Sequence, residues 1–494
     1  MVECRSILLC EEFTMLNFNE LKTEKVFEYF NAISKIPRGS GNMEKISDFC
    51  MDFAKEHSLK AIKDDACNVV IYKDGTKGYE NSPAVILQGH LDMVCQKEED
   101  YEIDFEKDGL DLYIDGDFIK AKGTTLGADN GIAVAMIMSI LADSTISHPP
   151  IEAVFTTDEE VGMLGALKLD MKNLKAKKMI NIDSEDPEVV TVSCAGGSDF
   201  RAEIPVKREK TEGECVTLTL KGLMGGHSGV EINSGRVNAN LLMGRFLNHL
   251  AKTARFDIIS LDGGDKGNAI TVSCTAKLVC KESEKLIAEI NAYTEVVKNE
   301  ITFRESGFEV EINIIGQGVF EAIKTPSTEN LIFILLCAPN GVVEMSAEIE
   351  NLVETSLNLG ILKTTEEEVV FSFALRSNKK TAMKFLEEKL DTFFSCVPCR
   401  ITKSGHYPPW EYNSNSTLQG LYIEKYNEKF GYEPSIEAIH AGLECGVFAS
   451  AIENFDCISI GPLMHGIHTV NEELSISSTR DIYDIVLGML EDLK

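Results

Sequence analysis

The sequence predicts an α/β fold: a discontinuous domain with a mixed, mainly parallel sheet, interrupted by an α+β insert. Three observations lead to this prediction. Apolar strand-like runs alternate with helical patterns up to about residue 190, as in sheets covered by helices on both faces. From about Phe200, polar and apolar residues alternate, which is typical of half-buried antiparallel strands. After Trp410, strand-like runs again alternate with helical patterns.

Two amphipathic helices open the N-terminal region. Apolar residues recur at helical spacing over residues 24–36, and Pro37 with the glycines after it ends that helix. A second helix is expected from Met43 to about His57. Apolar runs then predict strands at residues 68–72, 84–90, 151–157 and 178–183. Between the second and third runs, residues 131–143 predict a buried helix rich in alanine and isoleucine.

The insert combines alternating strands with helices. Strand patterns occur in ECVTLTLKGL, AITVSCTAKLVC and EEEVVFSFALRS, and helices are expected at 237–252 and 379–394. The returning segment predicts a helix at 418–430, a strand at 455–460 and a C-terminal helix from Ser478. Because 494 residues exceed a single core, we expect two domains. One comprises residues 1–197 and 409–494, and the other comprises residues 198–408.

Composition excludes several classes of protein. The formal net charge of −31 argues against a nucleic-acid partner, which requires basic patches. No apolar run approaches the roughly 18 residues of a membrane span. The start, MVECRSILLCEEFTMLNF, lacks the features of a signal peptide, so a cytoplasmic location is expected. Met15 opens the patterned sequence, so the residues before it are expected to form a loose extension.

The 14 cysteines are scattered and form no regular framework. We expect reduced, mostly buried thiols. Cys396 and Cys399 have CxxC spacing, which alone is weak support for redox or metal chemistry.

Acidic and histidine residues gather where predicted strands end or the buried helix begins: His90, Asp92, Asp129, Glu159, Glu160 and Asp183. Each alone would more often be a helix cap or a turn residue. Ligands bind beyond the carboxyl ends of strands in open α/β sheets, so their joint arrival there indicates a metal site. Imidazole and carboxylate are the ligands of catalytic zinc.

The spacing suggests different roles within this set. Two neighbouring ions need a shared carboxylate, and Asp129 is the candidate. Asp92 lies on the same side of an extended segment as His90, where it can fix the orientation of that ring. Glu159 and Glu160 diverge as adjacent side chains, so one can bind metal while the other takes a proton from water.

A family resemblance is carried by GHLDMV, GADNGIAVA, TTDEEVGMLGA, NIDSE, GGHSG, HAGLECG and GPLMHGIHTVNEEL, in this order. These motifs closely resemble the cytosolic aminoacyl-histidine dipeptidases of the PepD type. That group belongs to the family of co-catalytic zinc aminoacylases, dipeptidases and carboxypeptidases. The resemblance extends from Met15 over essentially the whole chain and includes IPRGSGN at residues 36–42.

The resemblance implies a role for each residue of the acidic and histidine set. It makes His90 and Asp183 terminal ligands of one metal, Asp129 the bridge, Glu160 and His468 ligands of the other, Glu159 the general base and Asp92 the orienting acid. It also implies a cis peptide between Asp129 and Asn130. The family pattern of histidine, serine or threonine, two residues and glutamate selects His468 over His465, although Val470 replaces the usual proline.

The resemblance implies further site residues outside the predicted strand ends. His227 is expected to stabilise the oxyanion, often from the partner subunit; the alternative is a structural hydrogen bond in a glycine-rich turn. Asn268 and Arg376 are expected to hold the substrate carbonyl and carboxylate, since a guanidinium matches a carboxylate; the alternative for Arg376 is an ion pair. His440 and Gly442 are expected either to contact substrate or to form a strand-to-helix turn.

The resemblance, together with the predicted metal site, implies a dimetal dipeptidase that hydrolyses Xaa-His and related dipeptides. Metal-bound hydroxide would attack the peptide carbonyl, with the insert as a lid and dimerisation domain of a homodimer. Two divalent ions are expected, zinc first, with manganese or cobalt also compatible with these ligands. The alternatives are an N-acyl amino acid deacylase or tripeptidase of the same family, and a non-catalytic metal-binding scaffold.

Overall fold

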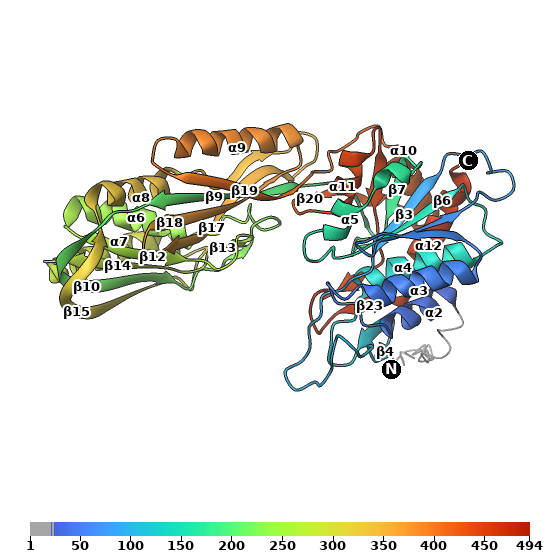
Figure 1. Cartoon of the computed structure of the whole chain (residues 1–494), viewed down its shortest axis with the longest axis horizontal. Helices are drawn as coiled ribbons and strands as arrows, with labels where there is room; N and C mark the ends of the chain where they lie inside the picture. Colours follow the sequence, from blue (N-terminus) through green and yellow to red (C-terminus); the bar gives the residue numbers. More distant parts are fainter. Residues whose placement is uncertain (1–20, 22–23) are drawn as a thin grey trace, which may run out of the picture. The chain divides into compact units, whose positions relative to one another are not determined.

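The computed structural model describes Leu21 and residues 24–494 (Figure 1). The predicted extension before Met15 lies outside these residues. The chain divides into two compact units. The first contains the described residues up to Val192 together with Asn413–Glu437 and Ala451–Lys494; the second contains Ser193–Tyr412 and Ala438–Ser450. The prediction assigns residues 438–450 to the returning segment, whereas they cluster with the second unit.

The first unit is built on an eight-stranded mixed sheet with the order β1-β2-β6-β3-β7-β21-β8-β20. Its central pairs β3–β6, β3–β7 and β7–β21 are parallel, and β1 and β2 add an antiparallel edge. The strands are β1 (Lys60–Lys63), β2 (Val69–Lys73), β3 (Val85–His90), β6 (Ile151–Thr156), β7 (Lys178–Asn181), β8 (Val189–Cys194), β20 (Ser435–Ile439) and β21 (Asp456–Ser459). The prediction of an α/β fold with a mixed sheet is confirmed, and the parallel pairs lie at the centre of this sheet.

A smaller antiparallel sheet, ordered β22-β23-β5-β4, also belongs to the first unit. Its strands are β4 (Leu112–Asp115), β5 (Phe118–Ala121), β22 (Met464–His465) and β23 (Glu473–Ser475). The pairing of β23 with β5 brings the C-terminal segment beside residues 118–120. Segments that are far apart in sequence therefore meet in this unit, as the blue and red ribbons of Figure 1 show.

The helices of the first unit are α2 (Lys25–Ser34), α3 (Glu44–Glu56), α4 (Ala128–Ala142), α5 (Leu164–Lys168), the 3₁₀ turn η1 (Met171–Asn173), α10 (Thr417–Phe430) and α12 (Ile476–Asp492). Helix α4 packs against β3 and α2 and is buried along almost its whole length, as expected for a helix that is apolar on all sides. Gly89 in β3 permits this contact, because a Cβ there would lie 2.4 Å from the Asn130 side chain. Among the described helices, none is long and apolar enough to span a membrane.

The second unit contains an antiparallel sheet with the order β15-β10-β14-β12-β17-β18-β9-β19, and β16 pairs with β17. Its strands are β9 (Gly196–Pro205), β10 (Arg208–Lys221), β12 (Asp257–Gly263), β14 (Cys274–Cys280), β15 (Glu309–Ile323), β16 (Gly341–Met345), β17 (Val353–Thr364), β18 (Glu368–Ser377) and β19 (Arg400–Tyr407). The short strands β11 (Gly226–His227) and β13 (Ala269–Ile270) pair separately. These strands pair antiparallel, as expected for the insert.

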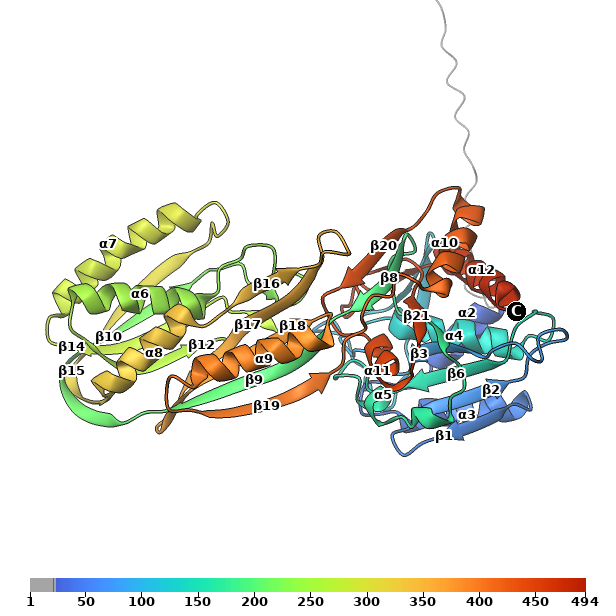
Figure 2. The same cartoon turned by 90° about the horizontal axis from the view of Figure 1, so that it is seen from above.

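Helices cover one face of the second unit's sheet (Figure 2). They are α6 (Ala239–Thr253), α7 (Ser283–Ile301), α8 (Thr325–Cys337) and α9 (Lys380–Phe394); α11 (Glu444–Ala451) also lies largely in this unit. Phe371, Phe373 and Leu375 of β18 join the core beneath α9. Arg376 follows Leu375 and therefore points to the opposite face.

Candidate metal centre

The predicted ligands of the first unit lie at the ends of its elements. His90 is the last residue of β3, and Asp129 lies in the first turn of α4. Asp183 follows β7, and the Glu159–Glu160 pair follows β6. The observed ends of β3, β6 and β7 therefore agree with the expectation that these side chains lie beyond the strand ends.

Asp129 lies between two histidines that come from distant segments. Its Oδ1 is 3.1 Å from His90 Nε2, and its Oδ2 is 3.1 Å from His468 Nε2. Each carboxylate oxygen thus faces a different ring. The peptide between Asp129 and Asn130 is cis, as the resemblance implied.

Two further carboxylates complete these contacts. Asp183 Oδ1 is 3.5 Å from His90 Nε2, and Glu160 Oε1 is 2.9 Å from His468 Nε2. Donor atoms of His90, Asp129 and Asp183 lie within 4.8 Å of one another, and so do those of Asp129, Glu160 and His468. The two triads share Asp129, which is the arrangement that a bridging ligand needs.

Glu159 belongs to a third group of donor atoms, with His90 and Glu160, that also lie within 4.8 Å of one another. The carboxylate that the sequence assigns to proton transfer is therefore beside both triads. Its main-chain N–H donates to Asp92 Oδ1 at 3.0 Å.

Asp92 is fully buried, and its carboxylate makes several hydrogen bonds. Its Oδ1 lies 3.4 Å from His90 Nδ1, and its Oδ2 accepts hydrogen bonds from the Glu160 main-chain N–H at 3.2 Å and from the Ser40 hydroxyl at 2.8 Å. One carboxylate therefore orients a candidate ligand ring and anchors the backbone of the Glu159–Glu160 pair. Such contacts set ring orientation and ligand basicity in metal sites.

Two buried charged residues that the sequence analysis did not single out hold the backbone of this centre. The Arg38 guanidinium donates from Nη1 to the Leu91 and Asp92 carbonyls at 3.0 and 3.1 Å, and from Nη2 to the Gly127 carbonyl. The Glu472 carboxylate accepts the main-chain N–H groups of residues 126, 127, 128 and 129 at 2.7, 2.9, 2.8 and 3.3 Å. Both lie within the motifs that carry the resemblance, which is the sequence signal that could have identified them.

Asn130 ties three of the ligand-bearing segments together. Its Oδ1 accepts the His90 main-chain N–H at 3.1 Å, and its Nδ2 donates to the Ile182 carbonyl at 2.6 Å. The residue after Asp129 thus fixes the backbone at His90 and beside Asp183. It is fully buried, so these hydrogen bonds are made without competition from water.

The pKa values in the cluster reflect its high charge. Burial raises the pKa of Asp183 to about 6, against the attraction of His90. Hydrogen bonds to Asp129 and Glu160 raise the pKa of His468 to about 10. Burial opposes the charged form of His90, but its neighbouring carboxylates outweigh burial and its pKa lies well above the usual value. The cluster thus favours positive charge at the positions of its two rings.

The donor set fits divalent transition-metal ions. Two imidazoles and several carboxylates, at least one of them shared, are ligands that zinc, manganese and cobalt accept. The histidine protons that compensate the carboxylates are those that a bound cation displaces, so metal binding is expected to release protons.

His227 and Arg376, both predicted as site residues, meet within the second unit. Arg376 Nη2 lies 3.4 Å from His227 Nε2, and the Val230 main-chain N–H donates to His227 Nδ1 at 3.3 Å. A neutral imidazole has a single acceptor nitrogen, so His227 cannot satisfy both donors. Burial and the nearby guanidinium lower the pKa of His227, which keeps the ring neutral. The pair therefore presents an excess of hydrogen-bond donors.

Asn268 lies next to His227. The Asn268 carbonyl accepts the Ser228 N–H at 2.9 Å, and both predicted residues line one pocket of about 840 Å³ in the second unit. Backbone pairing of β11 with β13 sets this proximity, because His227 pairs with Ala269.

His440 is buried, with both ring nitrogens engaged inside the second unit. Nε2 lies 2.7 Å from the Ser356 hydroxyl, and Nδ1 lies 3.2 Å from Asn378 Oδ1. Burial lowers its pKa to about 3, so the ring is neutral. Gly442 lies two residues before α11. The predicted substrate contacts of His440 and Gly442 stay predictions.

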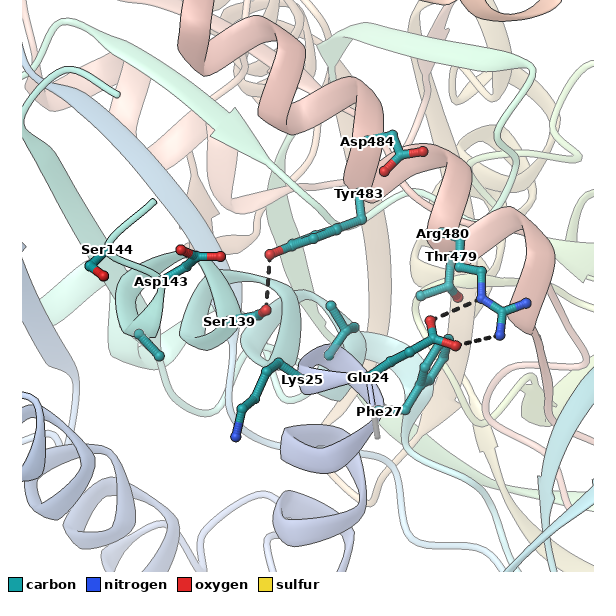
Figure 3. Close-up of a pocket in the computed structure, with 12 residues that line it drawn as sticks. Glu24, Lys25, Phe27, Ser139, Asp143, Ser144, Thr479, Arg480, Tyr483 and Asp484 are labelled. Carbon is teal, nitrogen blue, oxygen red and sulfur yellow. Dashed lines mark hydrogen bonds and ion pairs between the residues drawn. The ribbon is translucent and has the colours of Figure 1, made fainter. Parts of the chain in front are cut away.

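Two other features stand apart from the predicted site residues. Cys396 and Cys399 are free thiols, and neither belongs to a candidate metal group among the described residues. A pocket of about 650 Å³ lies between α2, α4 and α12 (Figure 3). Its wall carries the Glu24–Arg480 ion pair and a 2.9 Å hydrogen bond between Ser139 and Tyr483, and it contains none of the predicted site residues.

Comparison with known proteins identifies the family. Residues 86–492 match the model of peptidase family M20/M25/M40. The chain belongs to this family. It is therefore a peptide hydrolase, and the alternative of a non-catalytic scaffold is not supported.

Similarity to individual proteins supports the assignment of this peptidase to the family. It is 36% identical over 483 residues to the cytosol non-specific dipeptidase of Escherichia coli K12, covering 97% of this chain and 99% of the relative. The crystal structure of aminoacylhistidine dipeptidase from Vibrio alginolyticus matches with a TM-score of 0.87 and 36% identity, over 95% of this chain and 96% of that one. The resemblance to aminoacyl-histidine dipeptidases is thus confirmed. A tripeptidase from Staphylococcus aureus, 15% identical with a TM-score of 0.56 over 97% and 99% of the two chains, shares the fold.

Proposed function

We propose that this peptidase is a dimetal dipeptidase acting on Xaa-His and related dipeptides. The observation that carries the proposal is the position of Asp129, whose two oxygens face His90 and His468 separately. A carboxylate shared in this way supports two adjacent metal positions. The 36% identity to a dipeptidase over nearly the whole chain supports the choice of substrate.

The metal ligands are proposed to be His90, Asp129, Glu160, Asp183 and His468. When bound, two divalent ions would polarise the scissile carbonyl and lower the pKa of water at the centre. Zinc is proposed first, because the donor set suits it, and manganese or cobalt would fit the same ligands.

Glu159 is proposed as the general base. Its group lies beside His90 and Glu160, while its backbone is anchored to Asp92. It would take a proton from the attacking water and pass it to the leaving amine, a contribution of roughly 10²- to 10⁴-fold in rate for a positioned base. Asp92 would keep the His90 ring oriented.

The second unit is proposed to supply groups that hold the substrate. His227 would stabilise the developing oxyanion, Asn268 would contact the substrate carbonyl, and Arg376 would bind the terminal carboxylate. The donor excess around His227 and Arg376 supports an anionic partner for this pair. The roles of the two chain regions as catalytic and lid domains, a homodimer and a cytoplasmic location are part of the same proposal.

Hydrolysis of N-acyl amino acids or tripeptides is the main competing activity within the family. A panel of Xaa-His dipeptides, other dipeptides, tripeptides and N-acetyl amino acids separates these activities. The proposal requires the highest kcat/KM for dipeptides, and preferential cleavage of N-acetyl amino acids would replace it.

The adjacent pair Glu159 and Glu160 offers a matched test of the catalytic centre. Glu159→Ala should keep its metal content and lose about 10²- to 10⁴-fold in kcat on an Xaa-His dipeptide, because only proton transfer is removed. Glu160→Ala should lose metal as well as activity. Both variants are reconstituted from metal-free protein with zinc, manganese or cobalt, and metal is measured by mass spectrometry. Loss of metal from Glu159→Ala with unchanged residual activity would contradict the assignment.

A further inference from the structure

A row of residues crosses four neighbouring strands of the second unit's sheet. Tyr407 of β19 pairs with Gly197 of β9, which also pairs with Arg376 of β18, and Arg376 in turn pairs with Ser356 of β17. Directly opposed residues of antiparallel strands point to the same face. This face is opposite to the core residues Phe373 and Leu375, so the row lies on the side of the sheet away from α9.

Gly197 leaves room for the Tyr407 ring to cross its strand. A Cβ at Gly197 would lie only 2.2 to 2.3 Å from the Tyr407 ring and hydroxyl. With no side chain between them, Tyr407 reaches past β9 to Arg376 on the far strand. The Arg376 Nη1 group donates to the Tyr407 hydroxyl at 3.0 Å.

A bulge in β19 gives Tyr407 this direction. The register shifts between Ser404, which pairs with Asp199, and Tyr407, which pairs with Gly197, so β19 has one residue more than β9. Gly405 in the bulge has a φ of +62°, a conformation that favours glycine. Without the extra residue, strand alternation would place His406 rather than Tyr407 on this face.

Arg376 depends on few partners inside the chain. It is only 8% exposed, and its Nε is buried without a hydrogen-bond partner. Within the described part of the chain, no carboxylate forms an ion pair with it. Its second contact, with His227 Nε2 at 3.4 Å, is the one that a neutral ring already accepting from Val230 cannot satisfy. The Tyr407 hydroxyl is therefore its best-formed hydrogen bond.

We infer that Tyr407 is a positioning residue that fixes the Arg376 guanidinium for the terminal carboxylate of the substrate. The inference rests on the proposed dipeptidase function and extends it to a residue that family motifs did not select. The hydroxyl accepts one N–H and leaves the other guanidinium donors for an anion. A guanidinium held in one orientation loses less rotational freedom when it binds a carboxylate.

The decisive variant is Tyr407→Phe, which keeps the ring and removes the hydroxyl. For an Xaa-His dipeptide with a free carboxylate, KM should rise about tenfold while kcat changes by less than about threefold. For the same peptide as a C-terminal amide, KM should stay within about twofold of that of the unmodified protein. An equal change for both substrates, or no change for either, overturns the inference.

Gly197→Ala provides a second route to the same result. The added methyl group would displace the Tyr407 ring without removing its hydroxyl, so the same selective rise in KM is expected. Tyr422→Phe is the matched control, because it removes a tyrosine hydroxyl that donates to the Pro187 carbonyl at 3.3 Å within the first unit, outside this row. It should leave both KM values unchanged.

A double-mutant cycle tests whether Tyr407 acts through Arg376. In an Arg376→Ala background, Tyr407→Phe should have no further effect on KM. Additive losses would mean that the hydroxyl acts elsewhere, and the inference would fail.

Calorimetric binding of the dipeptide to metal-free protein separates this inference from the proposed function. If the protein binds the peptide and Tyr407→Phe weakens binding about tenfold, but no peptide is hydrolysed after metal addition, the function fails and the inference stands. If hydrolysis is normal and Tyr407→Phe binds like the unmodified protein, the inference fails and the function stands. If the unmodified protein neither binds the dipeptide nor hydrolyses it after metal addition, both fail.

Discussion

The candidate metal centre and the Arg376 cluster have opposite compositions. The metal centre gathers the carboxylates of Asp129, Glu160 and Asp183 around two histidine rings, and its acceptors outnumber its donors. The Arg376 cluster gathers donors, with one buried guanidinium and a neutral histidine that cannot accept from both neighbours. Excess hydrogen-bond acceptors favour binding of a cation, and excess donors favour binding of an anion. The imbalance in each cluster therefore indicates the charge of the ligand that it suits.

The two clusters are also held in different ways. The metal centre is fixed by buried charged side chains that bind backbone, namely Asp92, Glu472 and Arg38. The Arg376 cluster is fixed by strand register, a bulge and the absence of a side chain at Gly197. Substitution of a charged side chain should therefore disturb the first cluster most, and changes in shape should disturb the second.

The largest expected effect tests the acceptor excess directly. Asp129→Asn replaces one of the two oxygens that face the histidines with an NH₂ group, which cannot bind a cation. We expect metal affinity to fall by at least about 100-fold, more than for loss of an outer contact. Equilibrium competition with a chelator measures this affinity. Unchanged stoichiometry and affinity would show that Asp129 is not the shared ligand.

A smaller effect is expected when the support of the centre is altered. Glu472→Gln preserves volume but points an NH₂ donor at main-chain N–H groups that need an acceptor. Metal affinity should fall about 10- to 100-fold, as for other residues that orient ligands. Glu473→Gln is the control, since that neighbouring side chain pairs with Lys120 and His465 instead. Equal losses of metal affinity in the two variants would contradict a specific role for Glu472.

The smallest effect concerns the pH dependence of the second unit. The buried His440 has a pKa of about 3 when folded, below the value of about 6.5 in an unfolded chain. Between these values the unfolded state binds the extra proton, so acidification lowers the free energy of unfolding, by at most about 1.4 kcal/mol per pH unit. His440→Gln should flatten this slope. Denaturant unfolding at pH 7, 6 and 5, followed by fluorescence of the single tryptophan, Trp410, measures it; parallel slopes would contradict the role of His440.

Much of the fold was predictable because its signals are local. The buried helix at residues 131–143 and the strand at 84–90 are long apolar stretches, and they correspond to α4 and β3. The meeting of His90, Asp129 and Asp183 followed from the general position of ligands at strand ends. The choice of His468 depended instead on the family pattern, because nothing local distinguishes its segment from an ordinary loop.

Other parts of the site could not be predicted because they depend on contacts between distant backbones. Glu472 binds N–H groups more than 340 residues away; the family pattern contains this glutamate, but no local signal shows which backbone groups it binds. The direction of Tyr407 depends on one extra residue in β19, and alternation alone would have chosen His406. The engagement of both His440 nitrogens likewise depends on Ser356 and Asn378 from elsewhere in the unit.

The contact between Glu472 and the N-terminus of α4 constrains the order of events during synthesis. On a ribosome that adds 5–20 residues per second, roughly 15 to 60 s separate the emergence of Asp183 from that of His468. The nascent chain therefore carries His90, Asp129 and Asp183 long before the segment that holds Glu472 and closes the cluster. Under the proposed ligand assignment, stable metal loading would wait for the C-terminal segment, because the earlier carboxylates lack the support of Glu472 until then.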